Sequence, residues 1–127
     1  MGYLLDTHCF LWAIKQPERL SKRITSLLQA GQSQLLLSAA SLWEIAIKAR
    51  AGKLNVPGEP EFFARHMDTL GLEPLAVQTW HVNRIFTLPD HHKDPFDRLL
   101  VAQAQVEGLT ILTADPVIGR YHVKTLW

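Results

Sequence analysis

The segment DPFDRLLVAQAQVEGLTILTAD, residues 94–115, contains a predicted helix followed directly by a predicted strand. Asp94 and Pro95 have the pattern of a helix N-cap followed by proline in the first helical position. Gly108 is typical of the residue that ends a helix. The short apolar run at 109–113 has the pattern of a buried strand. A helix that leads straight into a buried strand is typical of an α/β fold.

The rest of the chain repeats this alternation. Further strands are predicted at 3–5, 34–37, 72–77 and 123–126, and further helices at 8–14, 21–30, 41–52, 60–70 and 78–86. Strands separated by helices predict an α/β/α sandwich with a mostly parallel central sheet. Because right-handed crossovers gather the carboxyl ends of parallel strands at one edge, a ligand site is expected at that edge.

Length and composition limit the class of protein. The 127 residues fit a single domain over 1–127, and 47% hydrophobic with 20% charged residues excludes a disordered chain. Lys and Arg number 13 against 12 Asp and Glu, so the net charge of +1 neither requires nor excludes nucleic acid. The single cysteine, Cys9, excludes an internal disulfide, and no apolar run is long enough to span a membrane. We therefore expect a cytoplasmic protein without membrane attachment.

Acidic residues occur where the predicted strands end. Asp6 follows strand 3–5, Asp115 follows strand 109–113, and Glu44 lies in the first turn of the helix predicted from Ser41. Carboxylates gathered at one edge repel one another and need a cation. Oxygen-only sites suit Mg²⁺ or Mn²⁺, and metal-assisted phosphodiester hydrolysis is the chemistry that such a site favours.

Each of these acids also has a purely structural explanation. Asp6 and Asp94 can cap the helices that follow them, and Asp115, which precedes a proline, can start a turn. Glu44 matches a capping box with Ser41 and can pair with a lysine four residues later. These explanations do not account for the acids meeting at one edge of the sheet.

Asp97 is harder to explain structurally. Its neighbours on the helix surface are small or apolar, including Leu100, Val101 and Ala104, whereas Arg98 falls on a more solvent-like face. An unpaired carboxylate in an apolar sector is costly, so a functional role is favoured.

At this point the chain resembles a known family. The matching segments are LLDTH at 4–8, SLWEIAIK at 41–48, DPFDRLLVAQA at 94–104 and LTAD at 112–115. In this order and spacing they resemble the PIN-domain family, and more narrowly the VapC-type toxin ribonucleases of bacterial toxin–antitoxin pairs. The resemblance covers nearly the whole chain.

The resemblance implies an endoribonuclease that depends on Mg²⁺ or Mn²⁺. It carries the acidic set over to Asp6, Glu44, Asp97 and Asp115. Asp6, Asp97 and Asp115 would hold the metal, and Glu44 would hold a second ion or orient the attacking water. Many relatives have asparagine at the Asp115 position, so its metal role is the least secure. The family also implies a 5′-phosphate product, a VapB-like antitoxin partner and a homodimer.

Several residues near these acids are candidates for supporting roles. Thr7 and Thr113 could hydrogen-bond a site carboxylate, and Asp94 could cap its helix or support the site. Candidate RNA contacts are the basic cluster of Lys48, Arg50 and Lys53 and the pair His91 and His92, although a solvated loop is the simpler expectation for the two histidines. Metal binding by them is disfavoured because no partner His or Cys set is spaced for it.

Two other functions fit parts of the pattern. The chain could be a catalytically silent binding module for RNA or protein that keeps the PIN-like scaffold, or a metal-dependent phosphatase. The D-x-D arrangement of the common aspartyl-phosphate phosphatases is missing, since Thr7 and His8 follow Asp6.

Overall fold

The computed structural model describes residues 2–127. Its strands are β1 (Gly2–Leu5), β2 (Gln34–Ser38), β3 (Leu72–Leu75), β4 (Thr110–Leu112) and β5 (Thr125–Leu126). Its α-helices are α1 (Thr7–Lys15), α2 (Lys22–Ala30), α3 (Ala39–Arg50), α4 (Pro60–Leu70), α5 (Thr79–Ile85) and α6 (Pro95–Glu107), and two single-turn 3₁₀ helices lie at Pro17–Arg19 and Ile118–Arg120. Every strand and helix predicted from the sequence is present, with ends that differ by a few residues.

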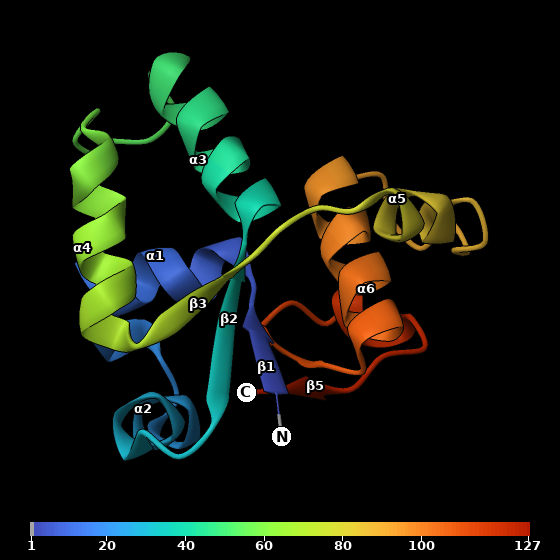
Figure 1. The fold of residues 1–127 in the computed structure, drawn as a ribbon, viewed down its shortest axis with the longest axis horizontal. Coiled ribbons are helices and arrows are strands. Elements are labelled where there is room, and N and C mark those ends of the chain that lie inside the picture. Colours follow the sequence, from blue (N-terminus) through green and yellow to red (C-terminus); the bar gives the residue numbers. More distant parts are fainter. Residues whose placement is uncertain (1) are drawn as a thin grey trace.

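The five strands form one sheet in the order β3-β2-β1-β4-β5, and every pairing is parallel. The chain moves outward from β1 to β2 and β3, then returns to the other side of β1 to form β4 and β5 (Figure 1). The strand order therefore reverses between β1 and β4, which is the position where open parallel sheets bind ligands.

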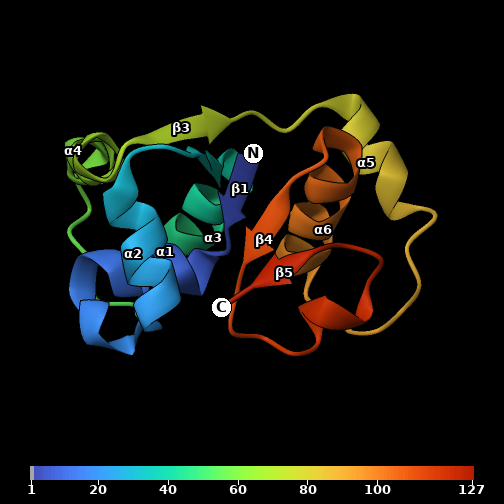
Figure 2. The same cartoon turned by 90° about the horizontal axis from the view of Figure 1, so that it is seen from below.

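Alternate residues of each strand face opposite layers of helices, as the strand period of two requires. Leu5, Leu37 and Leu112 pack with residues of α1, α2 and α3, whereas Leu4 and Ile111 pack with residues of α6. The sheet thus lies between two helical layers, with α1 and α2 on one side and α5 and α6 on the other (Figure 2). This is the predicted α/β/α sandwich.

Local sequence signals fix the helix ends near the sheet edge. The carboxylate of Asp6 accepts from the backbone N–H of Cys9 and caps α1, and Asp94 caps α6 by accepting from the N–H groups of Phe96 and Asp97. Gly108 ends α6 with a φ of 68°, which favours glycine. Both predicted N-caps are confirmed.

The predicted start of α3 is wrong. The helix begins at Ala39 with Ser38 as its N-cap, so Ser41 lies inside the helix and forms no capping box with Glu44. The Ser38 hydroxyl satisfies the N–H of Ala40, and buried strand β2 leads into α3 without a loop. Glu44 consequently lies in the second turn, and the capping box does not explain it.

Candidate metal and nuclease site

The carboxyl ends of β1 and β4 bring Asp6 and Asp115 to one place. The backbone N–H of Asp6 donates to the carbonyl of Leu112 at 3.1 Å, so the residue after β1 lies beside the end of β4. The Thr113 side chain hydrogen-bonds the Asp6 carboxyl, and its hydroxyl also accepts from the N–H of Asp115 at 3.0 Å. Thr113 therefore connects the two acids, as predicted for a supporting residue.

Asp6 is buried, with 4% of its surface exposed. Burial is the main cause that raises the pKa of this carboxyl, and hydrogen bonds from Thr113 and the Cys9 backbone only partly oppose it. A nearby cation would stabilise the charged form.

Glu44 reaches the same region from α3 and is held by two polar side chains. One carboxylate oxygen, Oε1, accepts from the Thr7 hydroxyl at 2.7 Å, and Oε2 accepts from Lys48 Nζ at 2.6 Å. The Ser41 hydroxyl lies 3.1 Å from the Thr7 hydroxyl oxygen, which can accept its proton. Hydrogen bonding to Glu44 raises the pKa of Lys48, with further contributions from the charges of Asp94 and Asp97. This buried carboxylate already has a cation beside it.

Asp97 lies in the first turn of α6 and faces the other acids. Burial is the main cause that raises its pKa to about 7, and repulsion from Asp94, Asp6, Glu44 and Asp115 contributes to the same rise. Asp94 is the N-cap of the same helix, but the other three acids come from distant parts of the chain, so the tertiary fold creates most of this concentration of negative charge. The predicted site residues are therefore brought together.

The structure adds His92 to this cluster. One ligand atom each from His92, Asp97 and Asp115 lie within 4.8 Å of one another, a spacing that could hold a metal ion. His92 Nε2 is 3.5 Å from Asp97 Oδ2, is buried, and has no hydrogen-bond partner among the described residues. The expectation of a solvated loop is wrong for His92, whose side chain is only 17% exposed.

Tyr121 and Arg98 hold His92 in this position. The Tyr121 hydroxyl oxygen accepts from Arg98 Nη1 at 3.2 Å and from the backbone N–H of His92 at 3.3 Å, so its own proton is available for His92 Nδ1 at 3.1 Å. That arrangement leaves the proton of a neutral imidazole on Nε2, facing the acids.

Tyr121 was not among the predicted site residues, and the predicted position of Arg98 was wrong. Arg98 was predicted on a solvent-like face, but its side chain is 14% exposed and donates to the carbonyl of Pro89 at 2.8 Å. Helical periodicity cannot reveal the loop at 87–94 that covers this face. The tyrosine, 23 residues further on, carried no local signal.

The remaining candidates are divided between surfaces. Lys48 and Lys53 line one groove of about 530 Å³, whereas Arg50 lines a different pocket between α3 and the start of α4. The predicted basic cluster is therefore split. His91 is exposed and its ring contacts the edge of Tyr121, with centroids 4.7 Å apart.

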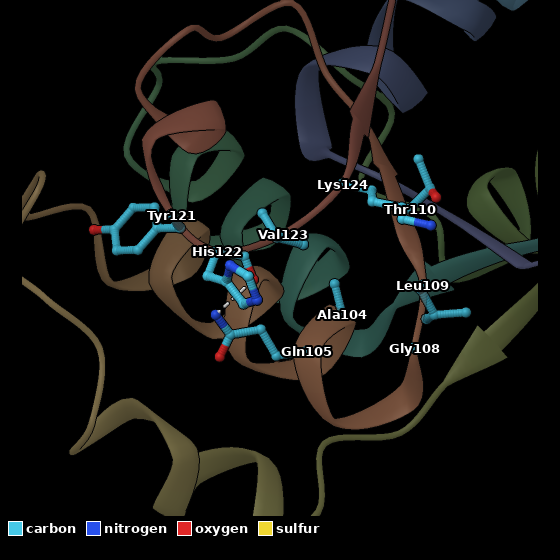
Figure 3. A pocket seen from close by; sticks show the side chains of 9 residues that line it. All are labelled: Ala104, Gln105, Gly108, Leu109, Thr110, Tyr121, His122, Val123 and Lys124. Atoms are coloured by element: carbon cyan, nitrogen blue, oxygen red, sulfur yellow. Dashed lines mark hydrogen bonds between the residues drawn. The ribbon is translucent and has the colours of Figure 1, made fainter.

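A pocket of about 470 Å³ lies at the opposite end of β4 from the acids. It is bounded by the end of α6, the start of β4 and residues 121–124 (Figure 3). Gln105 Nε2 donates there to the carbonyl of His122 at 3.0 Å. Among the described residues that line this pocket none is acidic, so it does not belong to the carboxylate cluster.

Known proteins resemble this chain in sequence and in fold. Residues 3–124 match the family described as PIN domain. The chain belongs to the PIN-domain family. As a PIN domain it is 29% identical over 117 residues to Ribonuclease VapC22 of Mycobacterium tuberculosis (strain ATCC 25618 / H37Rv), a match that covers 88% of this chain and 85% of that protein.

Solved structures share the fold of this PIN domain. VapBC2 from Rickettsia felis, bound to a DNA fragment from its promoter, superposes with a TM-score of 0.73 at 18% identity over 99% of this chain and 98% of that one. A toxin–antitoxin complex from Klebsiella pneumoniae gives a TM-score of 0.58 at 16% identity, over 89% and 86% of the two chains. At this identity the likeness shows the PIN fold.

No helix among residues 2–127 of this PIN domain has both the length and the apolar character required to cross a membrane.

Proposed function

We propose that this PIN-domain protein is a metal-dependent endoribonuclease and the toxin component of a type II toxin–antitoxin pair. The observation that carries the proposal is that Asp6, Glu44, Asp97 and Asp115 come from four segments of the chain and lie close enough to interact. Burial and the charges of these neighbours raise the pKa of Asp97 to about 7. Similarity to Ribonuclease VapC22 supports RNA as the substrate.

The donor set fits a divalent ion. Asp6, Asp97 and Asp115 supply hard oxygen donors, which Mg²⁺ and Mn²⁺ prefer. When bound, such an ion lowers the pKa of a water molecule and offsets the negative charge that develops on the phosphodiester.

The chain's own residues would prepare this chemistry. Thr113 and the Cys9 N–H fix the orientation of Asp6, and Thr7 fixes one oxygen of Glu44. Glu44, held between Thr7 and Lys48, would orient the attacking water. Lys48, which is 42% exposed, keeps its positive charge near the site and would attract the phosphate group of the RNA.

A solved structure of the same fold supports an antitoxin partner. The Klebsiella pneumoniae structure of the same fold is a toxin–antitoxin complex. We propose that a VapB-like antitoxin covers this site and that the protein forms a homodimer, for which the exposed apolar side chains Trp80, Val82 and Phe86 provide a surface on and beside α5. Light scattering of the purified chain, with and without the product of a neighbouring short reading frame, measures both assemblies.

Cleavage assays test the enzymatic proposal. Transfer RNA and an unstructured oligoribonucleotide are incubated with Mg²⁺ or Mn²⁺ and the wild-type chain. Asp6→Asn and Asp97→Asn should each reduce the cleavage rate at least about 100-fold, because metal assistance contributes several kcal/mol to such reactions. EDTA should abolish the activity.

The matched control is Asp68→Asn, which makes the same substitution at an exposed position on α4 and should cleave like the wild type. Cleavage that survives EDTA, or that Asp6→Asn and Asp97→Asn leave unchanged, would point to a contaminating nuclease and overturn the proposal. Metal-independent RNA binding without cleavage would support the silent module, and hydrolysis of a model phosphomonoester alone would support the phosphatase.

A further inference from the structure

A second surface feature adjoins the acidic site. A groove of about 530 Å³ runs between α1, the 3₁₀ turn at Pro17–Arg19 and the end of α3 with the residues that follow it. Thr7 and Lys48 line this groove, and both hydrogen-bond Glu44. The groove, which we call the α1 groove, therefore opens directly beside the carboxylates.

The charge of the α1 groove differs from that of the chain as a whole. The protein carries 13 basic and 12 acidic residues, so its charges are nearly balanced. Among the described residues that line the α1 groove, four are basic and none is acidic; the basic ones are Lys15, Arg19, Lys48 and Lys53. Lys48 is paired with Glu44. The other three leave a positive channel that leads to a negative site, and a polyanion matches it.

Two cations of the groove, Lys15 and Arg19, are held in place. Lys15 Nζ donates to the carbonyl of Asn55 at 2.6 Å, which fixes the position of the ammonium at the groove. An ammonium has three N–H donors, so this bond leaves two that can reach an anion. The Arg19 guanidinium lies over the Trp12 ring, 4.2 Å from its centroid. Trp12 in turn contacts Trp127, with ring centroids 5.7 Å apart. Side chains fixed in this way lose little conformational entropy when an anion binds.

Planar side chains lie beside the cations of the α1 groove. The Arg19 guanidinium has one face on Trp12, so its other face is available to stack. His8 is exposed on α1 and its ring lies 5.9 Å from that of Trp12. Alternating cations and planar groups match the phosphates and bases of a single strand, whose unpaired bases can stack on Arg and aromatic planes. An acidic peptide would satisfy the charges but would leave the planar groups unused.

We propose that the α1 groove binds a single-stranded segment of RNA next to the bond that is cut. In this arrangement Lys15, Arg19 and Lys53 contact successive phosphates, and His8 and the Arg19–Trp12 stack receive bases. The inference rests on the proposed function for the choice of RNA as ligand, and it names the part of the substrate that the site requires.

Binding without cleavage tests the groove. A fluorescein-labelled, unstructured 12-nucleotide RNA is titrated with the full chain in EDTA, and anisotropy is followed from low to high salt. The triple variant Lys15→Gln/Arg19→Gln/Lys53→Gln should bind at least about tenfold more weakly. The slope of log K against log salt should become shallower by about 2, since each phosphate contact to a single strand contributes about 0.7.

The matched control removes three exposed cations elsewhere. Arg65→Gln/Arg120→Gln/Lys124→Gln changes the net charge equally but leaves the α1 groove intact, and it should bind within about threefold of the wild type. Equal weakening by both triple variants would mean that only net charge matters, and unchanged binding by the first variant would mean that RNA lies elsewhere. Either result overturns the proposal. Thermal unfolding checks that both variants fold. If a triple variant does not fold, the single variants Lys53→Gln and Arg65→Gln repeat the comparison.

The stacking part has its own test. His8→Ala should weaken binding about fivefold or more without changing the salt slope, while His122→Ala, at another exposed histidine, should not. Polyglutamate that displaces the RNA as effectively as an unlabelled strand would favour a peptide ligand and overturn the proposal.

Because the assay contains no metal, its outcome is independent of the nuclease activity. A chain that binds RNA through the groove but never cleaves it would refute the proposed function alone, and a chain that cleaves while the groove variant binds normally would refute the groove alone.

Discussion

The two sides of the carboxylate cluster hold their negative charge differently. On the α3 side, Glu44 is buried but has Lys48 at 2.6 Å and Thr7 at 2.7 Å. On the α6 side, Asp97 lies near Asp94 and Asp115, and among the described residues its only ion-pair partner is His92, whose Nε2 is 3.5 Å away without a hydrogen bond.

This difference indicates where an ion belongs. The α3 side is locally neutral and stable as it folds, because the partners of Glu44 come from α1 and α3 themselves. The α6 side has negative charge that the described residues do not balance. Burial, and then repulsion from the neighbouring carboxylates, raise the pKa of Asp97 to about 7. The protein therefore supplies a cation at one side and leaves the other side for a ligand.

The largest expected effect is on metal affinity. Asp97→Asn should weaken Mn²⁺ binding at least about 100-fold, measured by calorimetry or by the loss of the free-ion EPR signal, because it removes a donor where charge is unbalanced. Glu44→Gln should weaken it less than about tenfold. The double variant Glu44→Gln/Lys48→Gln, which keeps the local charge constant, should return to within about threefold of the wild type. Equal losses for Asp97→Asn and Glu44→Gln would contradict the division into two sides.

Removing the internal cation should lower stability. Lys48→Met leaves the buried Glu44 carboxylate without its charge partner and should lower the free energy of unfolding by about 2 kcal/mol, less than for a fully buried pair because Lys48 is 42% exposed. Urea unfolding measures the change. Arg50→Met, two residues later at an exposed position of the same helix, is the control and should change stability by less than about 0.5 kcal/mol. A similar loss in both variants would mean that the pair with Glu44 is not the cause.

The pH dependence of stability tests the α6 side. Since the pKa of Asp97 is raised from 3.8 to about 7, the metal-free folded protein binds more protons than the unfolded chain between these values, and stability falls as pH rises through that window. Asp97→Asn removes this loss. It should stabilise the protein in EDTA by about 2 kcal/mol at pH 8 and should give no stabilisation at pH 4. Thermal unfolding across this range measures it, and saturating Mn²⁺ should reverse the order of the two proteins at pH 8. A stabilisation that is the same at both pH values would rule out ionisation of Asp97 as its cause.

The fold and the positions of the acids were predictable because their signals are local. Asp6 and Asp115 each follow a short apolar strand, and parallel topology then requires them to meet. Asp94 and Pro95 mark a helix start in any context. The family to which residues 3–124 belong was likewise recognisable from four short segments.

The contacts between distant segments were not predictable in this way. Glu44 looked like part of a capping box, and only the continuation of β2 into α3 shows that Ser38 is the cap. His92 looked like a solvated loop residue until Tyr121, 29 residues away, fixed its ring beside Asp97. The α1 groove likewise forms because Lys15 and Lys53 line the same surface, and no spacing in the sequence indicates this.

The smallest effect concerns Asp94, which has a structural explanation that the other acids lack. Its Oδ1 accepts from the N–H groups of Phe96 and Asp97 at 2.9 and 3.2 Å, so its carboxylate is already committed to the start of α6. Asp94→Ala should cost about 1 kcal/mol in urea unfolding, the usual loss for an N-cap, and Asp94→Asn should cost only a few tenths because asparagine caps equally well.

The same two variants separate capping from a role in the site. Neither should weaken Mn²⁺ binding more than about threefold, because the capping bonds direct the carboxylate toward the helix backbone. Asp94→Asn keeps the cap and removes the charge, so a loss of Mn²⁺ affinity in this variant as large as that of Asp97→Asn would place Asp94 among the ligands. A loss confined to Asp94→Ala would instead mean that the cap holds Asp97 in position, since Asp97 is the third residue of the helix that Asp94 begins.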